Sequence, residues 1–436
     1  MPAPKPVVGA PVDPSPPQGP KGGRVSGAIA KQRIHPIRYG VIPLGGAAGA
    51  EGEFVRQIEE TLGGASRVAP LGRARAGIYL LVKYAIEATG RRKVFMSPYT
   101  IPDLVNMVTL AGGEPVFYDH EPASTRCDIE YIRETLDTSF ACVLLTHYHV
   151  NETRIDQLLQ LCRKFGTLLF DDCALSFGGA VNGKPIGSLT DASVFSFSSF
   201  KLVNFFWGGM VATPSSELYD WITTRLAEWP RLNLLDYVRA ARICLTYDIA
   251  TRPALFRSLV YPALRGLSLL GRDTRVLEYA RIESARFDGS LASRPHPAAF
   301  TEWMHKLDGA PQLLARRRDV ARIYQSELSE FAVSQPTAAD MQEGCFVNYP
   351  IMVRPERRDE VCQTMIRQGF DIGRSLYCNS HRLPLYAGLQ GKSDNIDKLA
   401  NGSVYLPTHF GVSHQYAKDI AGALKVLLEK MDTPHL

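Results

Sequence analysis

The sequence predicts an α/β protein, a three-layer sandwich with a mostly parallel central sheet, joined to a smaller C-terminal α+β domain. Three observations predict this fold. Between residues 75 and 213 short apolar runs alternate with amphipathic helical patterns, which is typical of parallel sheets covered on both faces. Beyond residue 300 long helical patterns surround a few strand-like runs. A chain of 436 residues also exceeds what one hydrophobic core usually fills, so at least two subdomains are expected.

The first region alternates helices and strands in chain order. Apolar residues recur at helical spacing in three segments, two of which end on glycine, and the strand-like runs between them are four to eight residues long. The expected helices are 76–89, 101–113 and 155–166, and the expected strands are 93–98, 114–119, 141–148 and 167–172. The last strand ends on Asp171 and Asp172. Ligands collect at the carboxyl ends of parallel strands, so these acids lie in the expected neighbourhood of a site.

Four parts are predicted along the chain. Residues 1–25 are rich in Pro and Gly, lack the apolar core of a signal peptide, and are expected to form a disordered tail. Residues 26–214 form the large α/β domain, and 300–436 form the small domain, with helices expected at 310–331, 358–369 and 413–431. Residues 215–299 read as a helical insert or connector. Packing between subdomains or subunits is favoured for this insert over contact with a membrane surface or a lipid substrate.

Composition excludes several classes of function. The charge of +5 arises from 49 basic and 44 acidic residues without a long run of one sign, and Arg316–Arg318 are interpreted as a solvated helix face rather than a nucleic-acid patch. The eight cysteines show no zinc spacing and are expected to be reduced thiols of a cytoplasmic protein, so no metal is expected. No apolar run of about 18 residues occurs, so a membrane-spanning helix is not expected.

One lysine, Lys201, stands in the apolar stretch "VFSFSSFKLVNFFWGGMVAT", about thirty residues after Asp172. Pyridoxal phosphate (PLP) enzymes need this combination. The cofactor aldehyde forms a Schiff base with a lysine amine, and an aspartate pairs with the ring nitrogen. Apolar surroundings lower the pKa of a lysine because the charged form loses hydration, which favours the nucleophilic amine.

The segment "TLLFDDCALSFGGAVNGKPIGSLTDASVFSFSSFKLVNFFWGGMVAT" resembles the DegT/StrS family of PLP-dependent sugar aminotransferases, with its pattern "EDxA…GSxGDxxxFSFxxxK…GGxxxT". "SPYTIPDLVNMVTLAGGEPVFYDHEP", "LLTHYHVNETRIDQLLQLCRKFG" and "VYLPTHFGVSHQYAKDI" are similar to further family segments. The likeness covers about three quarters of the chain, from roughly residue 43 onward, and is poorest in the helical middle. It implies a fold type I PLP transferase.

Residue by residue, the resemblance implies that Lys201 is the Schiff-base lysine and that Asp172 is the partner of the pyridine nitrogen. Ser196 matches a serine that helps to hold the cofactor phosphate. Ala74 and Arg75 match part of the family's phosphate-binding "SGTAA" turn at a helix N-terminus, where free amides favour an anion. Arg75 replaces a threonine there and is a candidate phosphate ligand, with an exposed cap-region arginine as the alternative.

His147 matches a strand-end histidine of the family, with a purely structural histidine as the alternative. Three departures from the family pattern concern the ring and the substrate. Leu175 replaces a glutamine that contacts the ring hydroxyl, and Ser176 is the candidate to supply that bond. Ile101 replaces the ring-stacking aromatic residue, with Tyr99 as a candidate substitute. The "NYR" motif, which reaches the site of a neighbouring subunit, is lost near 298–300.

The expected function is transfer of an amino group from glutamate or glutamine to a keto-sugar, most plausibly nucleotide-linked, by a cytoplasmic homodimer. A carbonyl acceptor from natural-product or lipid-linked glycan synthesis stays open. The runner-up enzyme class is PLP-dependent elimination or dehydration, although dehydratase relatives carry histidine where this chain has Lys201. A regulatory protein on a decayed aminotransferase fold is the third hypothesis, favoured by the departures and opposed by the intact Asp172, Ser196 and Lys201.

Overall fold

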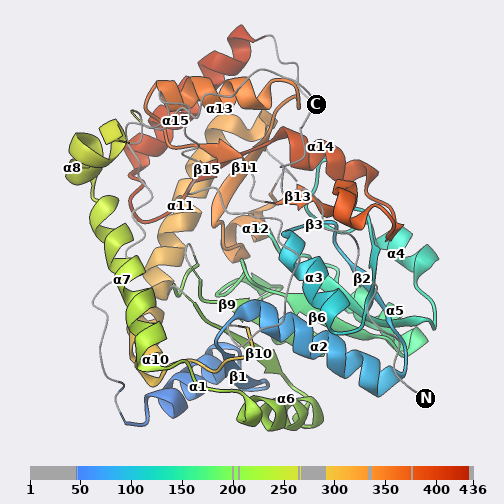
Figure 1. Cartoon of the computed structure of the whole chain (residues 1–436). Helices are drawn as coiled ribbons and strands as arrows, with labels where there is room; N and C mark the ends of the chain where they lie inside the picture. Colours follow the sequence, from blue (N-terminus) through green and yellow to red (C-terminus); the bar gives the residue numbers. More distant parts are fainter. Residues whose placement is uncertain are drawn as a thin grey trace.

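The computed structural model describes residues 46, 48–198, 201–204, 207–263, 266, 291–331, 336–374 and 377–431 (Figure 1). The predicted tail at 1–25 and much of the predicted insert beyond residue 263 lie outside these residues. Within them the α/β class and the mostly parallel sheet are confirmed.

The central sheet has eight strands in the order β1-β10-β9-β6-β5-β2-β4-β14. Only β10 runs against its neighbours, because β1 and β9 both pair with it antiparallel and the remaining pairs are parallel. The strands are β1 (Arg67–Leu71), β2 (Lys93–Met96), β4 (Glu114–Phe117), β5 (Phe140–Thr146), β6 (Leu168–Asp172), β9 (Ala192–Ser196), β10 (Gly209–Thr213) and β14 (Gln390–Gly391). All four predicted strands are present, and β1, β9 and β10 were not among them.

Helices cover both faces of the sheet, because successive strand residues point to opposite sides. In β2, for example, Phe95 belongs to one buried cluster while Val94 and Met96 belong to the other. The first face packs against α1 (Ala50–Thr61), α4 (Ile129–Thr135), α5 (Ile155–Phe165) and α10 (Pro297–Asp308). The second packs against α2 (Ala74–Thr89), α3 (Pro102–Leu110) and α6 (Ser216–Glu228). The predicted three layers are therefore confirmed.

The C-terminal region contains its own core around an antiparallel three-stranded sheet, ordered β11-β15-β12. Its elements are α11 (Ala310–Leu328), α12 (Ala338–Glu343), β11 (Asn348–Met352), α13 (Arg358–Arg367), β12 (Gly373–Arg374), α14 (Asp394–Gly402), β15 (Ser403–Pro407) and α15 (His414–Lys430). The same region also returns to the large domain, where β13 (Cys378–Asn379) pairs with β3 (Tyr99–Thr100) and β14 pairs with β4. The exact domain boundaries stay predictions.

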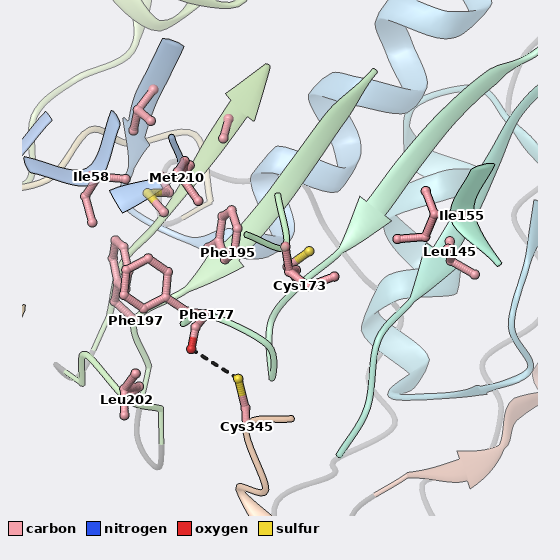
Figure 2. Packing of buried hydrophobic residues seen from close by; sticks show 14 of the residues in the cluster. Ile58, Leu145, Ile155, Cys173, Phe177, Phe195, Phe197, Leu202, Met210 and Cys345 are labelled. Carbon is pink, nitrogen blue, oxygen red and sulfur yellow. Dashed lines mark hydrogen bonds between the residues drawn. The ribbon is translucent and has the colours of Figure 1, made fainter. Parts of the chain in front are cut away.

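The loop that carries Lys201 is anchored by the residue after it. Leu202 is buried in the cluster on the first face of the sheet, which also contains Phe177 and Phe197 (Figure 2). The thiol of Cys345 donates to the carbonyl oxygen of Phe177 across 3.3 Å, which ties the C-terminal region to the same cluster (Figure 2). The residue that follows Lys201 is therefore fixed by packing.

Candidate functional site

Asp172 is the last residue of β6, and its side chain interacts electrostatically with the amine of Lys201. Asp172 is 5% exposed, and its Oδ1 accepts the backbone N–H of Ala174 at 3.0 Å. Burial raises the pKa of Asp172, while the Ala174 hydrogen bond and the positive charge of Lys201 oppose that rise. Burial lowers the pKa of the Lys201 amine to about 8, against the attraction of Asp172. Burial therefore favours the neutral form of the Lys201 amine, and the charge of the buried Asp172 acts on it.

His147 contacts Asp171 at the same strand end. Its Nδ1 accepts the backbone N–H of Glu152 at 3.2 Å, so the neutral ring carries its proton on Nε2. That Nε2 lies 3.2 Å from Oδ1 of Asp171, and both side chains are fully buried. The other oxygen of Asp171 accepts the hydroxyl of Thr190 at 2.9 Å. Asp171 therefore has a hydrogen-bond partner in Thr190, whereas the neighbouring Asp172 is the carboxylate whose charge acts on the Lys201 amine.

His147 and Asp171 also form, with Cys173, a buried group whose potential metal-ligand atoms lie within 4.8 Å of one another. Burial raises the pKa of the Cys173 thiol well above its usual range. Within the cluster, Nε2 of His147 and Oδ1 of Asp171 are 3.2 Å apart.

The predicted phosphate-binding residues meet where α2 starts. Arg73 is the N-cap of α2 and provides no side-chain cap, and its backbone bridges to Gly208. Gly209 is the register partner of Ser196, and a Cβ at Gly209 would stand 2.6 Å from the Cα of Ala74. Glycine thus lets the strand approach the helix N-terminus directly. The uncapped amides at Ala74 and the Ser196 strand end form a cradle suited to a phosphate.

Three other predicted site residues, Arg75, Tyr99 and Ser176, have partners within the protein. Arg75 forms an ion pair with Asp103 and is partly exposed. Tyr99 is fully buried, and its hydroxyl lies 3.0 Å from that of Tyr405. The Ser176 hydroxyl donates to a backbone carbonyl, that of Tyr148, at 3.4 Å, and is fully buried. The structure therefore brings together Lys201, Asp172, His147, Ser196 and Ala74, and places Arg75, Tyr99 and Ser176 in contacts with other side chains or backbone.

A cavity of about 1200 Å³ opens on Lys201. Within the described part of the chain, Lys201 is the predicted site residue that lines this cavity. Most of the other lining residues belong to α10, α11 and the start of α15. Cationic or histidine side chains are frequent around it. They are His305, Lys306, Arg316, Arg317, His409 and His414, with Glu302 and Asp319 as the acids.

The prediction that Arg316–Arg318 form a solvated face is wrong for Arg317, which is 3% exposed and lines the cavity. It lies on the buried stripe of α11, between Leu314 and Val320. Burial lowers the pKa of Arg317 to about 10, and its charge helps to lower the pKa of Lys201. The i, i+3 spacing of this stripe was present in the sequence and could have identified Arg317 as inward-facing.

Glu302 and Lys306 were also missed. They stand one helical turn apart on α10 with 3.5 Å between Lys306 Nζ and Glu302 Oε1, and both side chains are largely buried. Burial raises the pKa of Glu302 and lowers that of Lys306. The sequence signal was an acid followed four residues later by a base, a spacing that is usually interpreted as an exposed helix pair.

A lysine amine of lowered pKa, a buried strand-end carboxylate and an uncapped helix N-terminus fit PLP, which needs a nucleophilic amine, an anionic partner for its ring nitrogen and a phosphate cradle. On a mostly parallel sheet with helices on both faces, this arrangement defines the class of fold type I PLP enzymes.

Residues 47–227 and 301–425 match the model of the DegT/DnrJ/EryC1/StrS aminotransferase family. The chain belongs to this family, whose aminotransferases depend on PLP, and it is a PLP-dependent aminotransferase. Residues 228–300 fall outside the match, in agreement with the poor resemblance expected for the helical middle.

Named relatives support the same assignment, and a solved structure shares the fold. The chain is 31% identical over 140 residues to GDP-perosamine synthase of Vibrio cholerae, covering 32% of this chain and 38% of that protein. It is 24% identical over 327 residues to dTDP-4-dehydro-2,3,6-trideoxy-D-glucose 4-aminotransferase of Saccharopolyspora spinosa, covering 74% and 75% of the two chains. The fold is similar to that of Helicobacter pylori PseC, an aminotransferase involved in the biosynthesis of pseudoaminic acid, with TM-score 0.67, 17% identity and coverage of 87% and 91%.

Proposed function

We propose that this enzyme transfers an amino group from glutamate or glutamine to the carbonyl of a nucleotide-linked keto-sugar. The observation that carries the proposal is the Lys201 amine, whose pKa is lowered to about 8 beside the buried Asp172 and which opens on a large cavity. The named relatives are a synthase of a GDP-linked sugar and an aminotransferase of a dTDP-linked sugar, which supports this acceptor class.

The residues of this chain have separable roles in the proposal. PLP, when bound, supplies an electron-accepting ring that makes the α-hydrogen of an amino acid acidic. Lys201 would hold the cofactor, and its neutral amine would serve as the base that moves a proton. Asp172 keeps the ring nitrogen protonated. The uncapped N-terminus at Ala74 and the Ser196 hydroxyl hold the phosphate.

The cavity supports an acceptor that carries phosphate. Its volume of about 1200 Å³ exceeds what an amino acid alone needs and lies above the usual range of about 300–1,000 Å³ for ligand pockets. Arg316 and Arg317 line it together with Lys306, and guanidinium groups bind phosphate oxygens through paired, charge-assisted hydrogen bonds. Glu302 and Asp319 are the acids of the lining, and a carboxylate there could accept a hydrogen bond from a sugar hydroxyl.

The proposal also includes the cellular location and the oligomeric state of the enzyme. None of the described helices combines the length and apolarity that crossing a bilayer requires. We propose a cytoplasmic enzyme that acts as a homodimer, in line with the resemblance to the family, and the loss of the "NYR" motif implies that the neighbouring subunit contributes differently here.

Half-reactions test the function directly. Purified protein incubated with PLP should develop the visible absorbance band of lysine-bound cofactor, and glutamate or glutamine should convert it to the spectrum of the aminated cofactor. A panel of GDP-, dTDP- and UDP-linked 4-keto sugars should then restore the first band, and the active member identifies the acceptor. Lys201→Ala is the matched control and should show no lysine-bound band. A band that forms but never responds to any amino donor would contradict transamination and favour elimination.

A further inference from the structure

Helix α7 (Leu234–Ala250) is apolar on two faces. Its inner face is buried and consists of Tyr237, Ala240, Ala241 and Cys244. Its outer face carries five large apolar side chains that are 40–59% exposed: Leu234, Leu235, Val238, Leu245 and Ile249. The spacing of these five residues places them within about 100° of one another around the helix axis. A surface helix normally has a polar outer face, so the apolar outer face of α7 indicates a contact with a partner.

The apolar residues form a patch rather than a scatter. Within the described chain, six of the nine exposed large apolar side chains lie between residues 234 and 259, and the sixth is Leu259 in the π-helical turn η1 (Phe256–Val260) that follows α8 (Pro253–Leu255). Single exposed leucines are ordinary, but a cluster of this kind marks an interaction surface.

Basic residues surround the patch. Residues 234–260 contain four arginines, at 239, 242, 252 and 257, all exposed, and two aspartates, at 236 and 248. Asp236 pairs with Arg239, and Asp248 interacts electrostatically with the inward-facing Glu302 and Lys306. The outward charge is therefore positive. Two copies of this face brought together around a twofold axis would oppose like charges, which disfavours a second copy as the occupant and favours an anionic surface.

The position of the patch links it to the site. Residues 228–300 lie outside the family match, so the sequence of this helix departs from the family pattern. Figure 1 shows α7 along the outer edge of the molecule, with α10 at one end and α8 at the other. Its inner residue Tyr237 interacts electrostatically with Glu302, one of the residues that line the Lys201 cavity. Whatever covers the outer face of α7 therefore lies one helix away from the cavity.

We propose that the outer face of α7 and η1 docks the protein on an anionic phospholipid bilayer, with the helix parallel to the surface. The apolar side chains enter the boundary between headgroups and acyl chains, and the arginines extend to lipid phosphates. The proposal stands on residues outside the PLP site and holds whether or not the acceptor is a nucleotide-linked sugar. It makes the enzyme a peripheral membrane protein whose cavity opens close to the lipid surface.

Vesicle flotation tests the proposal with the full-length, PLP-loaded protein. Vesicles of mixed phosphatidylglycerol and phosphatidylcholine should carry the protein upward, and pure phosphatidylcholine vesicles should bind it at least about tenfold more weakly. The double variant Leu245→Gln/Ile249→Gln should lose about tenfold or more of the partition coefficient, and Arg239→Gln/Arg242→Gln should weaken the dependence on salt. Val426→Gln is the matched control, because Val426 is 49% exposed on α15, and it should bind as the parent does.

The visible cofactor band and the melting temperature show that each variant is folded, and they separate this proposal from the one on function. Absence of binding to either vesicle, or binding that the α7 substitutions leave unchanged, would overturn the proposal. A dimer in sedimentation that Leu245→Gln/Ile249→Gln turns into a monomer would instead assign the face to a second copy. A large fall in melting temperature for that variant, without vesicle binding by the parent, would assign it to intramolecular packing.

Discussion

The titration of Lys201 provides the sharpest test of the electrostatic reasoning. With a pKa of about 8, roughly one amine in ten is neutral at pH 7. With the ordinary value of 10.5 the neutral fraction would be about one in three thousand, so burial increases the reactive form by about 300-fold. Two charges act on this amine in opposite directions. Asp172 stabilises the ammonium form and raises the pKa, whereas Arg317 destabilises it and lowers the pKa.

The assay is stopped-flow capture of PLP by the cofactor-free enzyme, followed through the visible band as a function of pH. The capture rate should rise about tenfold per pH unit and level off near pH 8. Asp172→Asn should move the midpoint to lower pH, and Arg317→Gln should move it to higher pH. Arg322→Gln is the matched control, since Arg322 lies on the same helix, is half-exposed and pairs with Asp319. A parent midpoint near 10.5, or shifts of the same sign in both variants, would refute the reasoning.

Three further outcomes concern the cofactor cradle and the base of the lysine loop. Ser196→Ala should raise the Kd for PLP about tenfold in equilibrium dialysis, because one hydrogen bond to a charged phosphate is lost; an unchanged Kd would remove Ser196 from the cradle. Gly209→Ala should weaken PLP binding further and abolish competition by inorganic phosphate, since the new Cβ would stand 2.6 Å from the Cα of Ala74; full retention of phosphate competition would contradict the cradle. Leu202→Ala should lower the free energy of unfolding in urea by about 2–5 kcal/mol by leaving a cavity, whereas the exposed Val426→Ala should change it by less than about 0.5 kcal/mol.

The framework of the large domain was predictable because its signals are local. Apolar spacing of 3.6 residues or continuous apolar runs identified α2, α3, α5 and the four strands β2, β4, β5 and β6. The strands β1, β9 and β10 were missed for physical reasons. Strand β1 contains Pro70, which cannot donate to a ladder, and β10 begins at Gly209, a weak strand former. Their pairing is set by contacts between distant segments, which a linear pattern does not show.

The same distinction holds for the site. Lys201, Asp172 and Ser196 lie within one continuous segment, so their relationship could be predicted from spacing and from the family resemblance. Arg317 comes from a helix more than a hundred residues later and joins the cavity through tertiary packing. Its charge suggested solvent exposure, although the apolar stripe on which it lies indicated the opposite. Tyr99 was predicted from proximity to a motif position, and the structure gives its hydroxyl a partner in Tyr405.

The most direct measurement of the central claim is the identity of the lysine that binds the cofactor. PLP-loaded protein is reduced with borohydride, digested and mapped by mass spectrometry, which fixes the pyridoxyl group on the residue that held it. The structure predicts a single modified peptide that contains Lys201, and no modified peptide when the protein carries Lys201→Ala. Modification of another lysine, such as Lys306 in the same cavity, or retention of a modified peptide in the variant, would contradict the assignment.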